Sequence, residues 1–442
     1  MRQTREIITT LLSNIGSRKE VEQYLKQFSS VDSKRFAVVK VGGGIVSDNL
    51  EALASALTFL HHVGLYPIVI HGAGPQLDVA LKEAGIETSR IDGLRVTTPQ
   101  VLEIARKVFQ RENLKLVEAL ESLGTRARPI TTGVFEAKPV EDARLGLVGE
   151  VVDIHLDAID SSIRAGHLPI LACLGETAGG QILNINADVA AADLAIKLQP
   201  HKIIFLTPTG GLLDQHGRII SAINLAEEFE HLMSQPWVNG GMRLKLQEIK
   251  DLLDELPHSS SVSITSPEHL ARELFTHRGS GTLVQRGERV RCLDSFDQAD
   301  QARLRTLLEN CFQRQLDGDY FNKKQCHRLY LSDSYRATAI ITLEGDIPYL
   351  DKFAVTKEAQ GVGLGAALWL RMRGDLPRMF WRSRSENPIN LWYFDKAQGS
   401  YRTDVWTVFW YGLDDFARVK WCIERALAMP ATFIAHGSAE PS

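Results

Sequence analysis

The chain contains 442 residues, of which 44% are hydrophobic, and it carries a net charge of −4. This length suggests two or three globular domains of roughly 100–200 residues each, and the small charge gives no sign of nucleic-acid binding. No apolar stretch approaches the roughly 18 residues of a membrane span, and residues 1–14 lack the apolar core of a signal peptide. Five scattered cysteines without a C-x-x-C pair argue against a zinc site or a disulfide framework. We therefore expect a reduced, soluble, cytoplasmic protein that binds neither membranes nor nucleic acid.

The first part of the chain alternates apolar strands with helices. Apolar residues at helical spacing predict one amphipathic helix over residues 1–31. The other predicted elements are strands at 36–41, 67–74, 129–135, 169–175 and 202–208 and helices at 50–63 and 77–85. Strands that alternate with helices form a mostly parallel sheet with both faces covered. We expect an open, three-layer α/β domain over residues 32–287.

The pattern changes after residue 287. A predicted helix at 301–312 precedes short predicted strands, and all but one of the seven tryptophans lie in this part. The strands are expected at 328–332, 336–343, 349–355, 378–384 and 407–412. Short strands in close succession favour a more antiparallel sheet. We expect a second domain over residues 288–442.

Two glycine clusters, KVGGG at residues 40–44 and HGAG at 71–74, close the first two predicted strands. Ligands bind at the carboxyl ends of parallel strands, where glycine lets backbone N–H groups approach anions and helix N-termini add positive partial charge. Lys40 adds a full charge beside the first cluster. Tight turns alone would also explain these glycines, but two matched clusters favour a phosphate site. The chain has no G-x-x-x-x-G-K-[ST] sequence, so this site is not a P-loop.

Three more motifs follow in order: DGLRVT at residues 92–97, LNINAD at 183–188 and NGGMRLKL at 239–246. Together with the glycine clusters they resemble the five motifs of the amino-acid kinase fold, and closely those of the N-acetylglutamate kinases. The resemblance implies phosphoryl transfer from ATP to a carboxylate, which needs charge stabilisation and no general base. Mg²⁺ would come with the nucleotide phosphates, so we expect no metal site made of side chains.

The resemblance also implies a role for each residue of these motifs. Lys40 and Lys245 would flank the transferred phosphoryl group and stabilise its charge, and Asp188 would hold both lysines. Arg95 would bind the α-carboxylate of the acceptor bidentately, and Asn184 would hydrogen-bond the same acceptor. A surface cation at Arg95 and a turn residue at Asn184 are the alternatives. The backbone N–H groups that line the phosphate path would belong to Gly43, Gly44, Gly72 and Ala73.

Two positions depart from the kinase pattern. Ala73 replaces the usual glycine of the second cluster, which keeps the N–H group but adds a methyl group that we expect to crowd the site. Pro208 stands where many of these kinases have an aspartate near the nucleotide, and proline removes both a carboxylate and an N–H donor. The resemblance therefore does not decide whether this part of the chain binds a nucleotide and acts as a kinase.

Residues 266–284 resemble the carboxyl-terminal signature of arginine-inhibited acetylglutamate kinases, which also carry an additional N-terminal helix. The resemblance implies an allosteric site for L-arginine. Glu273 and the backbone around Gly279 and Gly281 would bind the effector. An ordinary terminal helix and strand with normal capping would also fit this segment.

The stretch QGVGLGAAL at residues 360–368 fits two patterns. Gly361, Gly363 and Ala366 match the dinucleotide fingerprint G-x-G-x-x-A, which needs an acidic residue about 20 positions further on. The next predicted strand ends in arginines, which argues against this interpretation. The second pattern, Q-x-x-G-x-G from Gln360 to Gly365, resembles the acyl-CoA loop of GNAT-type acetyltransferases.

The acetyltransferase resemblance implies how acetyl-CoA would bind. Backbone N–H groups would face its pyrophosphate, with the helix N-terminus behind them. They would come from Gly361, Val362, Gly363, Leu364, Gly365 and Ala366. The preceding strand would run beside the pantetheine arm and polarise the thioester through its backbone, at residues Phe353, Ala354 and Val355.

Arg382 and Arg384 alternate along a predicted strand and therefore point to one face. With Lys352 they predict a cationic pocket beside the acetyl donor, to which Asn387 and Asn390 add neutral hydrogen-bonding groups. Such a pocket suits a small diacid that carries an amine, although an edge strand with solvated arginines is an alternative. The stretches YLDKFAV, FWRSR, NPIN-WYF and FWYGL together resemble the vertebrate-type N-acetylglutamate synthase domain, so the implied acceptor is L-glutamate.

The same resemblance implies direct transfer of the acetyl group from the thioester to the amine of glutamate. Tyr393 would protonate the leaving thiolate, which a tyrosine with an ordinary pKa of about 10 can do. An ordinary core aromatic is the alternative for Tyr393. We find no convincing general base in the sequence.

Taken together, the resemblances predict a bifunctional enzyme of arginine biosynthesis. Its second domain would make N-acetylglutamate from L-glutamate and acetyl-CoA, and its first would phosphorylate N-acetylglutamate with ATP. We expect regulation by L-arginine and assembly into a homo-oligomer, by family analogy a tetramer. Two alternatives stay open: a synthase whose kinase-like domain only senses arginine, and a non-catalytic arginine sensor.

Overall fold

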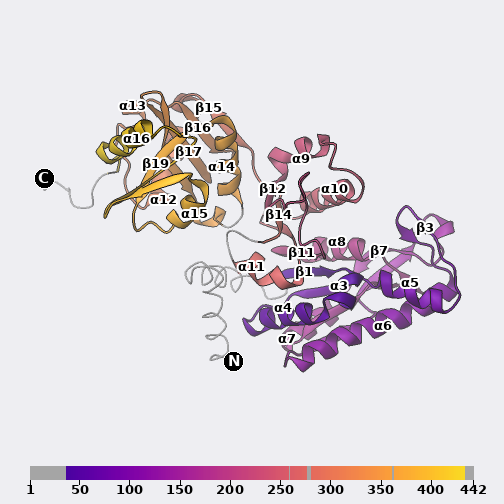
Figure 1. Ribbon diagram of the computed structural model, residues 1–442. Helices are drawn as coiled ribbons and strands as arrows, with labels where there is room; N and C mark the ends of the chain where they lie inside the picture. The colour runs from indigo at the N-terminus through magenta and orange to yellow at the C-terminus, as the bar shows by residue number, and fades with distance from the viewer. Residues whose placement is uncertain (1–35, 258, 276–279, 361–362, 434–442) are drawn as a thin grey trace. The chain divides into compact units, whose positions relative to one another are not determined.

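A computed structural model describes residues 36–257, 259–275, 280–360 and 363–433. The chain divides into two compact units at Arg286/Gly287, and the short segment Ala226–Phe229 belongs to the second unit (Figure 1). The helix predicted over residues 1–31 lies outside the described residues, as do Gly279, Gly361 and Val362.

The first unit is built on an eight-stranded sheet in the order β12-β14-β13-β11-β1-β2-β8-β5. Neighbouring strands are parallel except β13 and β14. The strands are β1 (Ala37–Val41), β2 (Ile68–His71), β5 (Ala127–Ile130), β8 (Leu168–Ala172), β11 (Lys202–Leu206), β12 (Ala222–Asn224), β13 (Ser261–Thr265) and β14 (Thr282–Gln285). Continuous apolar runs form most of these strands because helices cover both faces.

Smaller sheets lie beside the main one. Four strands pair in the order β10-β9-β6-β7, and β3 and β4 form a hairpin. Their bounds are β3 (Arg90–Ile91), β4 (Leu94–Arg95), β6 (Phe135–Pro139), β7 (Gly149–Ile154), β9 (Leu174–Glu176) and β10 (Ile182–Asn184). The strands predicted at 129–135 and 169–175 are therefore each two strands. In the first case Gly133, at φ +82°, turns the chain from the main sheet into the smaller one.

The helices of this part separate into two layers. Val39 and Val41 of β1 share one hydrophobic cluster with α4 and α11, whereas Val38 shares the other with α5 and α8. The helices are α3 (Gly43–Asp48), α4 (Leu50–His62), α5 (Gly74–Glu83), α6 (Pro99–Ser122), α7 (Asp157–Arg164), α8 (Ala187–Leu198), α9 (Leu225–Ser234), α10 (Gly240–Glu255) and α11 (Leu270–Phe275). The predicted three-layer, mostly parallel α/β architecture is confirmed.

The second unit contains a seven-stranded sheet in the order β15-β16-β17-β18-β19-β21-β20. Neighbouring strands are antiparallel except β18 and β19. The elements are β15 (Val290–Leu293), α12 (Gln301–Phe312), α13 (Tyr320–Lys323), β16 (Arg328–Ser332), β17 (Ala337–Glu344), β18 (Ile347–Val355), α14 (Leu364–Asp375), β19 (Met379–Arg384), α15 (Asn390–Lys396), β20 (Gly399–Arg402), β21 (Trp406–Tyr411) and α16 (Phe416–Ala428). The more antiparallel sheet predicted for this part is confirmed.

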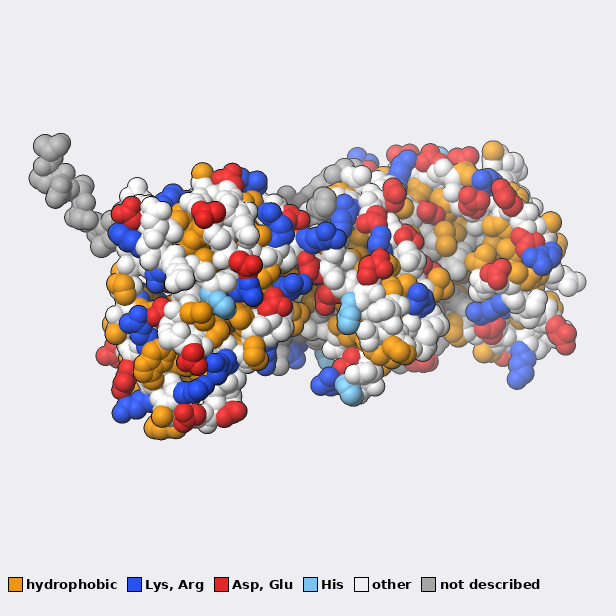
Figure 2. All heavy atoms as spheres, turned by 90° about the horizontal axis from the view of Figure 1, so that it is seen from above, with side chains coloured by type: hydrophobic (Ala, Val, Ile, Leu, Met, Phe, Trp, Pro, Cys, Tyr) orange, Lys and Arg blue, Asp and Glu red, His pale blue; other side chains and the backbone are white. Residues whose placement is uncertain are grey.

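The surface carries no strong bias of charge on the face that Figure 2 shows. Basic and acidic side chains are interspersed there, in keeping with the net charge of −4. Within the described ranges, no helix combines the length and apolar character that crossing a membrane requires.

Candidate functional site

The two glycine clusters meet at the carboxyl edge of the first unit's main sheet. A Cβ atom added to Gly43 would lie 3.1 Å from the backbone nitrogen of Gly74. One added to Gly72 would lie 3.8 Å from the nitrogen of Gly43 and 3.4 Å from Cβ of Ala187, at the start of α8. Three N-terminal helix turns therefore converge here, and their close approach leaves little space for a side chain at Gly43 and Gly72, whereas Gly44 and Gly74 have open space around them. Such an arrangement of N–H groups suits an anion.

Lys40 and Asp188 form an ion pair beside these turns, with 2.8 Å between Nζ and Oδ1. Asn186 caps α8, and its side-chain oxygen accepts from the N–H group of Asp188 at 2.7 Å. Lys245 of α10 lies with Nζ 4.7 Å from the centre of the Phe205 ring. Burial lowers the pKa of Lys245, while the charge of Asp188 raises it and that of Lys40 lowers it. The three charged groups predicted from the motifs are therefore close enough to interact.

Glu248, which the motifs did not single out, belongs to the same group. It follows Lys245 by three positions on α10, and this spacing places both side chains on one face of the helix. Burial raises the pKa of its carboxyl group, and the charge of Asp188 raises it further, whereas Lys245 and Lys40 oppose this. A Lys-x-x-Glu pattern is too common on solvated helix faces to identify a site residue by itself.

Arg95 is buried on β4, which rules out the alternative of a solvated surface cation. Its Nη2 atom lies 2.5 Å from Oδ1 of Asp78, while its Nη1 atom is buried without a hydrogen-bond partner among the described residues. A buried charged donor without a partner is costly, and a carboxylate ligand would supply one. The side chain of Asn184 donates to the hydroxyl of Thr97 at 3.1 Å, and that hydroxyl donates to the carbonyl of Arg95 at 2.9 Å. The two predicted acceptor-binding residues are thus connected through Thr97.

The two departures from the kinase pattern have different surroundings. Ala73 is buried in the hydrophobic cluster that contains Ile70 and Leu77, so its methyl group packs into the core. The expectation that this methyl group crowds the site is therefore wrong. Pro208 is exposed in the turn after β11, where the N–H group of Thr207 donates to the carbonyl of Thr265 at 2.9 Å.

Glu273 of α11 contacts the turn that was predicted to bind arginine with it. Its Oε2 atom accepts hydrogen bonds from the N–H groups of Ser280 and Gly281, both at 2.9 Å. A Cβ atom at Gly281 would collide with the carbonyl oxygen of Ile264, so the close approach requires glycine there. One carboxylate oxygen of Glu273 therefore holds the turn at Ser280 and Gly281 in place. Gly279 lies outside the described residues.

In the second unit, β18, the glycine-rich loop and α14 form the predicted strand-loop-helix unit. Gly363 is the N-cap of α14 and has φ +75°, which favours glycine. The side chain of Gln360 donates to the carbonyl of Val355 at 3.2 Å and fastens the loop to the end of β18. A Cβ atom at Gly365 would lie 3.3 Å from Cγ2 of Val355, so helix and strand pack closely.

The sheet opens between β18 and β19. These parallel strands pair only at Tyr349–Phe380 and Leu350–Trp381. Beyond these pairs, β18 continues with β17 as its partner and β19 continues with β21. The two strands therefore diverge, and among the described residues, 351–355 have no partner strand on the β19 side.

Tyr393 lies on the α14 face of this sheet, in a cluster of aromatic rings. Its ring centre is 5.5 Å from those of Trp381 and Phe409 and 6.4 Å from that of Phe353. Burial raises the pKa of its hydroxyl group, which keeps the proton on the oxygen at neutral pH. This burial fits both a proton donor and the core-aromatic alternative.

Lys352 lies on the opposite face, and a β-bulge places it there. Ile340 of β17 pairs with Lys352 and Ile341 with Leu350, which leaves Asp351 as the extra residue. Because of this bulge, the side chains of Asp351 and Lys352 turn to the same side instead of alternating. Their carboxylate and ammonium groups are in direct contact.

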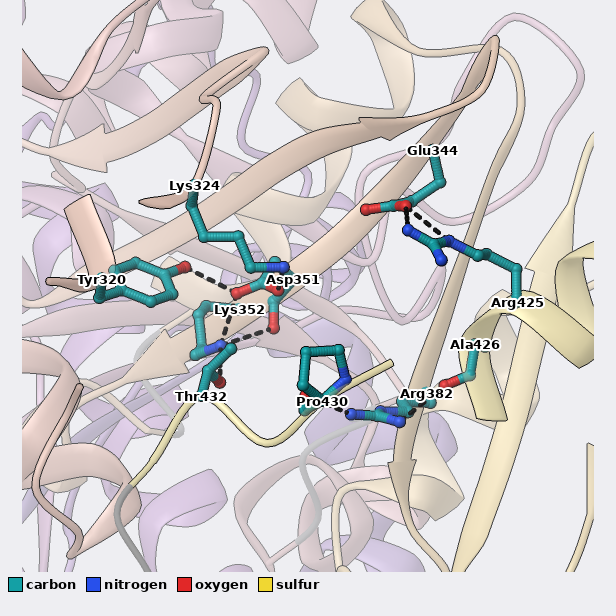
Figure 3. Close-up of polar contacts among 10 residues, drawn as sticks. All are labelled: Tyr320, Lys324, Glu344, Asp351, Lys352, Arg382, Arg425, Ala426, Pro430 and Thr432. Atoms are coloured by element: carbon teal, nitrogen blue, oxygen red, sulfur yellow. Dashed lines mark hydrogen bonds and ion pairs between the residues drawn. The ribbon is translucent and has the colours of Figure 1, made fainter. Parts of the chain in front are cut away.

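Asp351 is the centre of a buried polar cluster (Figure 3). The hydroxyl of Tyr320 donates to its Oδ2 atom at 2.6 Å, and Nζ of Lys324 lies 3.2 Å from its Oδ1 atom. Burial acts to raise the pKa of Asp351, but Lys352, Lys324 and Tyr320 together hold it below its ordinary value. Burial lowers the pKa of Lys352, and Asp351 opposes this. The sequence pointed to Lys352 alone, because neither the bulge nor the position of α13 was predictable from it.

Arg382 and Arg384 lie on one face, as their alternation predicted. The guanidinium carbon of each is 4.2 Å from the centre of the Trp406 ring. Arg382 also donates to the carbonyl oxygens of Ala426 at 2.7 Å and Pro430 at 3.0 Å (Figure 3). Their strand, β19, lies between β18 and β21 in the sheet. Its pairing with β18 ends at Trp381, and Arg384 is exposed, so the alternative of an edge strand with solvated arginines stays open for Arg384.

The two predicted asparagines organise the turn between β19 and α15. The side-chain nitrogen of Asn390 donates to the carbonyls of Arg384 at 2.7 Å and Ser385 at 3.3 Å. The side-chain oxygen of Asn387 accepts from the N–H group of Ile389 at 3.3 Å. These contacts use groups that were expected from the sequence to face the acceptor.

Comparisons with known proteins match a different family to each of the two units. Residues 35–265 match the amino acid kinase family, and residues 291–428 match the family described as NAT, N-acetyltransferase, of N-acetylglutamate synthase. The chain is 55% identical to an acetylglutamate kinase of Xanthomonas campestris pv. campestris over 425 residues, which cover 95% of this chain and 100% of that protein. It is 34% identical to the mitochondrial N-acetylglutamate synthase of Homo sapiens over 441 residues, which cover 96% of this chain and 79% of that protein.

A solved structure contains the same two folds. The N-acetylglutamate synthase from Neisseria gonorrhoeae, complexed with coenzyme A and N-acetyl-glutamate, matches with a TM-score of 0.61 at 19% identity. The match covers 89% of this chain and 98% of that one. The chain therefore belongs to the amino acid kinase family, and its second unit is a NAT domain of the N-acetylglutamate synthase type.

Proposed function

We propose that the protein is an arginine-biosynthesis enzyme with two activities. The second unit acetylates L-glutamate with acetyl-CoA, and the first phosphorylates the resulting N-acetylglutamate with ATP. The observation that carries the proposal is that Lys40, Asp188 and Lys245 come together beside the glycine turns, in a chain that spans all of an acetylglutamate kinase relative. A protein that only sensed arginine would have no evident need of this group.

In the first reaction, a side-chain carboxylate oxygen of N-acetylglutamate attacks the γ-phosphorus of ATP. A new P–O bond forms while the bond to the β,γ-bridging oxygen breaks, and ADP leaves. Lys40 and Lys245 stabilise the charge on the transferred group, and the buried Nη1 atom of Arg95 binds the α-carboxylate. Within the described residues, no cluster of three or more His, Cys, Asp or Glu side chains could hold a metal, and the proposal assigns Mg²⁺ to the nucleotide phosphates.

In the second reaction, the neutral amine of glutamate attacks the acetyl carbon, and the C–S bond of acetyl-CoA breaks. The thiolate takes a proton from Tyr393, and the attacking nitrogen releases one proton to water, from which the Tyr393 oxygen is reprotonated. The pantetheine arm pairs with the free edge of residues 351–355, and the pyrophosphate lies at the N-terminus of α14. Lys352 and Arg382 receive the carboxylates on the other face, and the gap between β18 and β19 lets the amine reach the thioester.

A synthase with an inactive kinase-like unit is the second candidate. It is favoured by the match to the human N-acetylglutamate synthase over 96% of this chain and by Pro208, which supplies no carboxylate or N–H near the proposed nucleotide site. Under either function we propose that L-arginine binds near Glu273 and Ser280–Gly281 and regulates the enzyme, and that the protein assembles as a homo-oligomer. The related Neisseria gonorrhoeae synthase has also been solved with coenzyme A and L-arginine, at 20% identity and a TM-score of 0.56.

Two separate product assays test the proposal. One measures acetylglutamate from glutamate and acetyl-CoA, and the other traps acetylglutamyl phosphate formed from acetylglutamate and MgATP. Lys40→Ala should reduce the second product by roughly a thousandfold and leave the first unchanged, because one preorganised charge is lost. Tyr393→Phe should reduce the first by roughly a hundredfold or more and leave the second unchanged.

The wild-type results separate the candidates. Acetylglutamate without any phosphate product, from folded protein, would reject bifunctionality in favour of the synthase alone. Absence of both products, with arginine still bound, would leave the non-catalytic sensor. If Lys40→Ala abolished both products, the two sites would not be independent.

A further inference from the structure

A short segment after α16 contacts the cations that the proposed function assigns to glutamate. We call Met429–Phe433 the covering segment. The carbonyl of Pro430 accepts from Nη2 of Arg382 at 3.0 Å, and the hydroxyl of Thr432 accepts from Nζ of Lys352 at 2.7 Å. Figure 3 shows both contacts approaching from the same stretch of chain. The segment therefore lies where an acceptor with two carboxylates would have to bind.

The contacts of Lys352 use all of its hydrogen-bonding capacity. An ammonium group has three N–H donors, and Nζ of Lys352 contacts Oδ2 of Asp351, the carbonyl of Asp351 at 3.3 Å and the hydroxyl of Thr432. The bulge builds in the first two contacts, because Asp351 is the adjacent residue. Thr432 lies 80 positions further along the chain and is the partner that a ligand can replace.

The covering segment is held in place by specific packing. The N–H group of Asp317 donates to the carbonyl of Thr432 at 3.1 Å, and Phe433 forms a β-bridge with Leu316. The ring of Phe433 lies 4.8 Å from that of Phe312. These contacts hold Thr432 in the position from which its hydroxyl reaches Lys352.

We propose that Thr432 determines the affinity for the acceptor, because its hydroxyl takes the N–H donor of Lys352 that a carboxylate must take. This inference rests on the proposed acetyltransferase function. A carboxylate forms a stronger, charge-assisted hydrogen bond with an ammonium group than a hydroxyl does. A dicarboxylate can replace the contacts at both Lys352 and Arg382, whereas a monocarboxylate replaces only one. Competition with the covering segment thus favours glutamate over amino acids with a single carboxylate.

The test replaces Thr432 in the full chain and measures the KM for glutamate at saturating acetyl-CoA. Thr432→Val keeps the shape but removes the hydroxyl, so glutamate no longer has to displace a hydrogen bond, and its KM should fall roughly tenfold. The KM for acetyl-CoA should not change, because its proposed contacts lie across the gap. Thr432→Ser retains the hydroxyl and should keep the KM of the unaltered protein.

Equilibrium binding of glutamate in the presence of coenzyme A provides a readout that does not depend on turnover, and Kd should fall with KM in Thr432→Val. An unchanged or increased Kd for glutamate in Thr432→Val would overturn the proposal and make the segment a wall of the site. If the unaltered protein formed no acetylglutamate at all, the proposed function would fail, which is a different result from a synthase whose KM does not respond to Thr432.

Discussion

The two candidate sites hold their lysines in opposite ways. In the first unit, Lys40 pairs with Asp188, whose side chain is 40% exposed, and Arg95 keeps a buried N–H group without a partner among the described residues. In the second unit, Lys352 and Asp351 have side chains that are only 4% and 5% exposed. The first site leaves part of its charged groups accessible, whereas the second encloses its charge in contacts within the chain.

This difference teaches that a motif predicts where a lysine lies but does not predict whether its ammonium group is accessible to a ligand. The carboxylate partner of Lys40 belongs to a helix N-terminus at an open sheet edge. The partner of Lys352 is the adjacent residue, forced to the same side by a bulge. Removing the carboxylate should therefore impair chemistry in the first unit and folding in the second.

The largest expected effect is on stability. Asp351→Asn leaves the buried Lys352 and the partly exposed Lys324 without their anion, which should cost about 3–5 kcal/mol. The thermal midpoint of the second unit should fall by roughly 10 °C, measured by calorimetry on the full chain. Asp188→Asn is the matched control, and a partly exposed pair of this kind should change stability by less than about 1 kcal/mol. If both variants lost the same free energy of unfolding, the proposed difference between the two sites would be wrong.

The next effect concerns recognition in the first unit. Arg95→Lys removes the planar guanidinium that can take a carboxylate bidentately, and the KM for N-acetylglutamate should rise roughly 10- to 100-fold. Arg90→Lys is the control, because Arg90 contacts the same Asp78 at 3.3 Å but has a side chain that is 54% exposed. Steady-state kinetics of the kinase reaction should show no change for this control. A similar KM increase in both variants would mean that Arg95 acts only by holding Asp78.

The smallest effect is on pH dependence. Burial lowers the pKa of Lys245, so its positive charge is present at low pH and is lost as the pH rises through a value below the ordinary lysine pKa of about 10.4. As the pH is raised, the kinase rate should therefore begin to decline before the pH reaches the ordinary lysine pKa. The charge of Glu248 raises the pKa of Lys245, so Glu248→Gln should move the decline to still lower pH.

The acetyltransferase reaction of the same protein is the internal control for this pH profile. Its alkaline limb should be the same with and without Glu248→Gln, since Lys245 and Glu248 belong to the first unit only. A kinase profile that did not move would show that the charge of Glu248 is not felt at Lys245.

The sequence by itself determined the fold classes and predicted the candidate residues of the first site. Alternating apolar strands and helices predict a parallel sheet, and the carboxyl ends of its strands gather at one edge. This rule placed the two glycine clusters at one edge, whereas the grouping of Lys40, Asp188 and Lys245 came from the resemblance of their motifs to those of the amino-acid kinases. Alternation along β19 likewise predicted that Arg382 and Arg384 share a face.

Only the tertiary structure decided which groups surround these residues. The bulge at Asp351 is a property of the register between β17 and β18, and a strand pattern with period two cannot express an extra residue. The contact between Lys352 and Thr432 joins residues 80 positions apart through the packing of α16 and the segment after it. The burial of the Ala73 methyl group likewise depends on which side of the turn faces the core. Local pattern specifies elements and faces, whereas partners from distant segments follow only from how those elements pack.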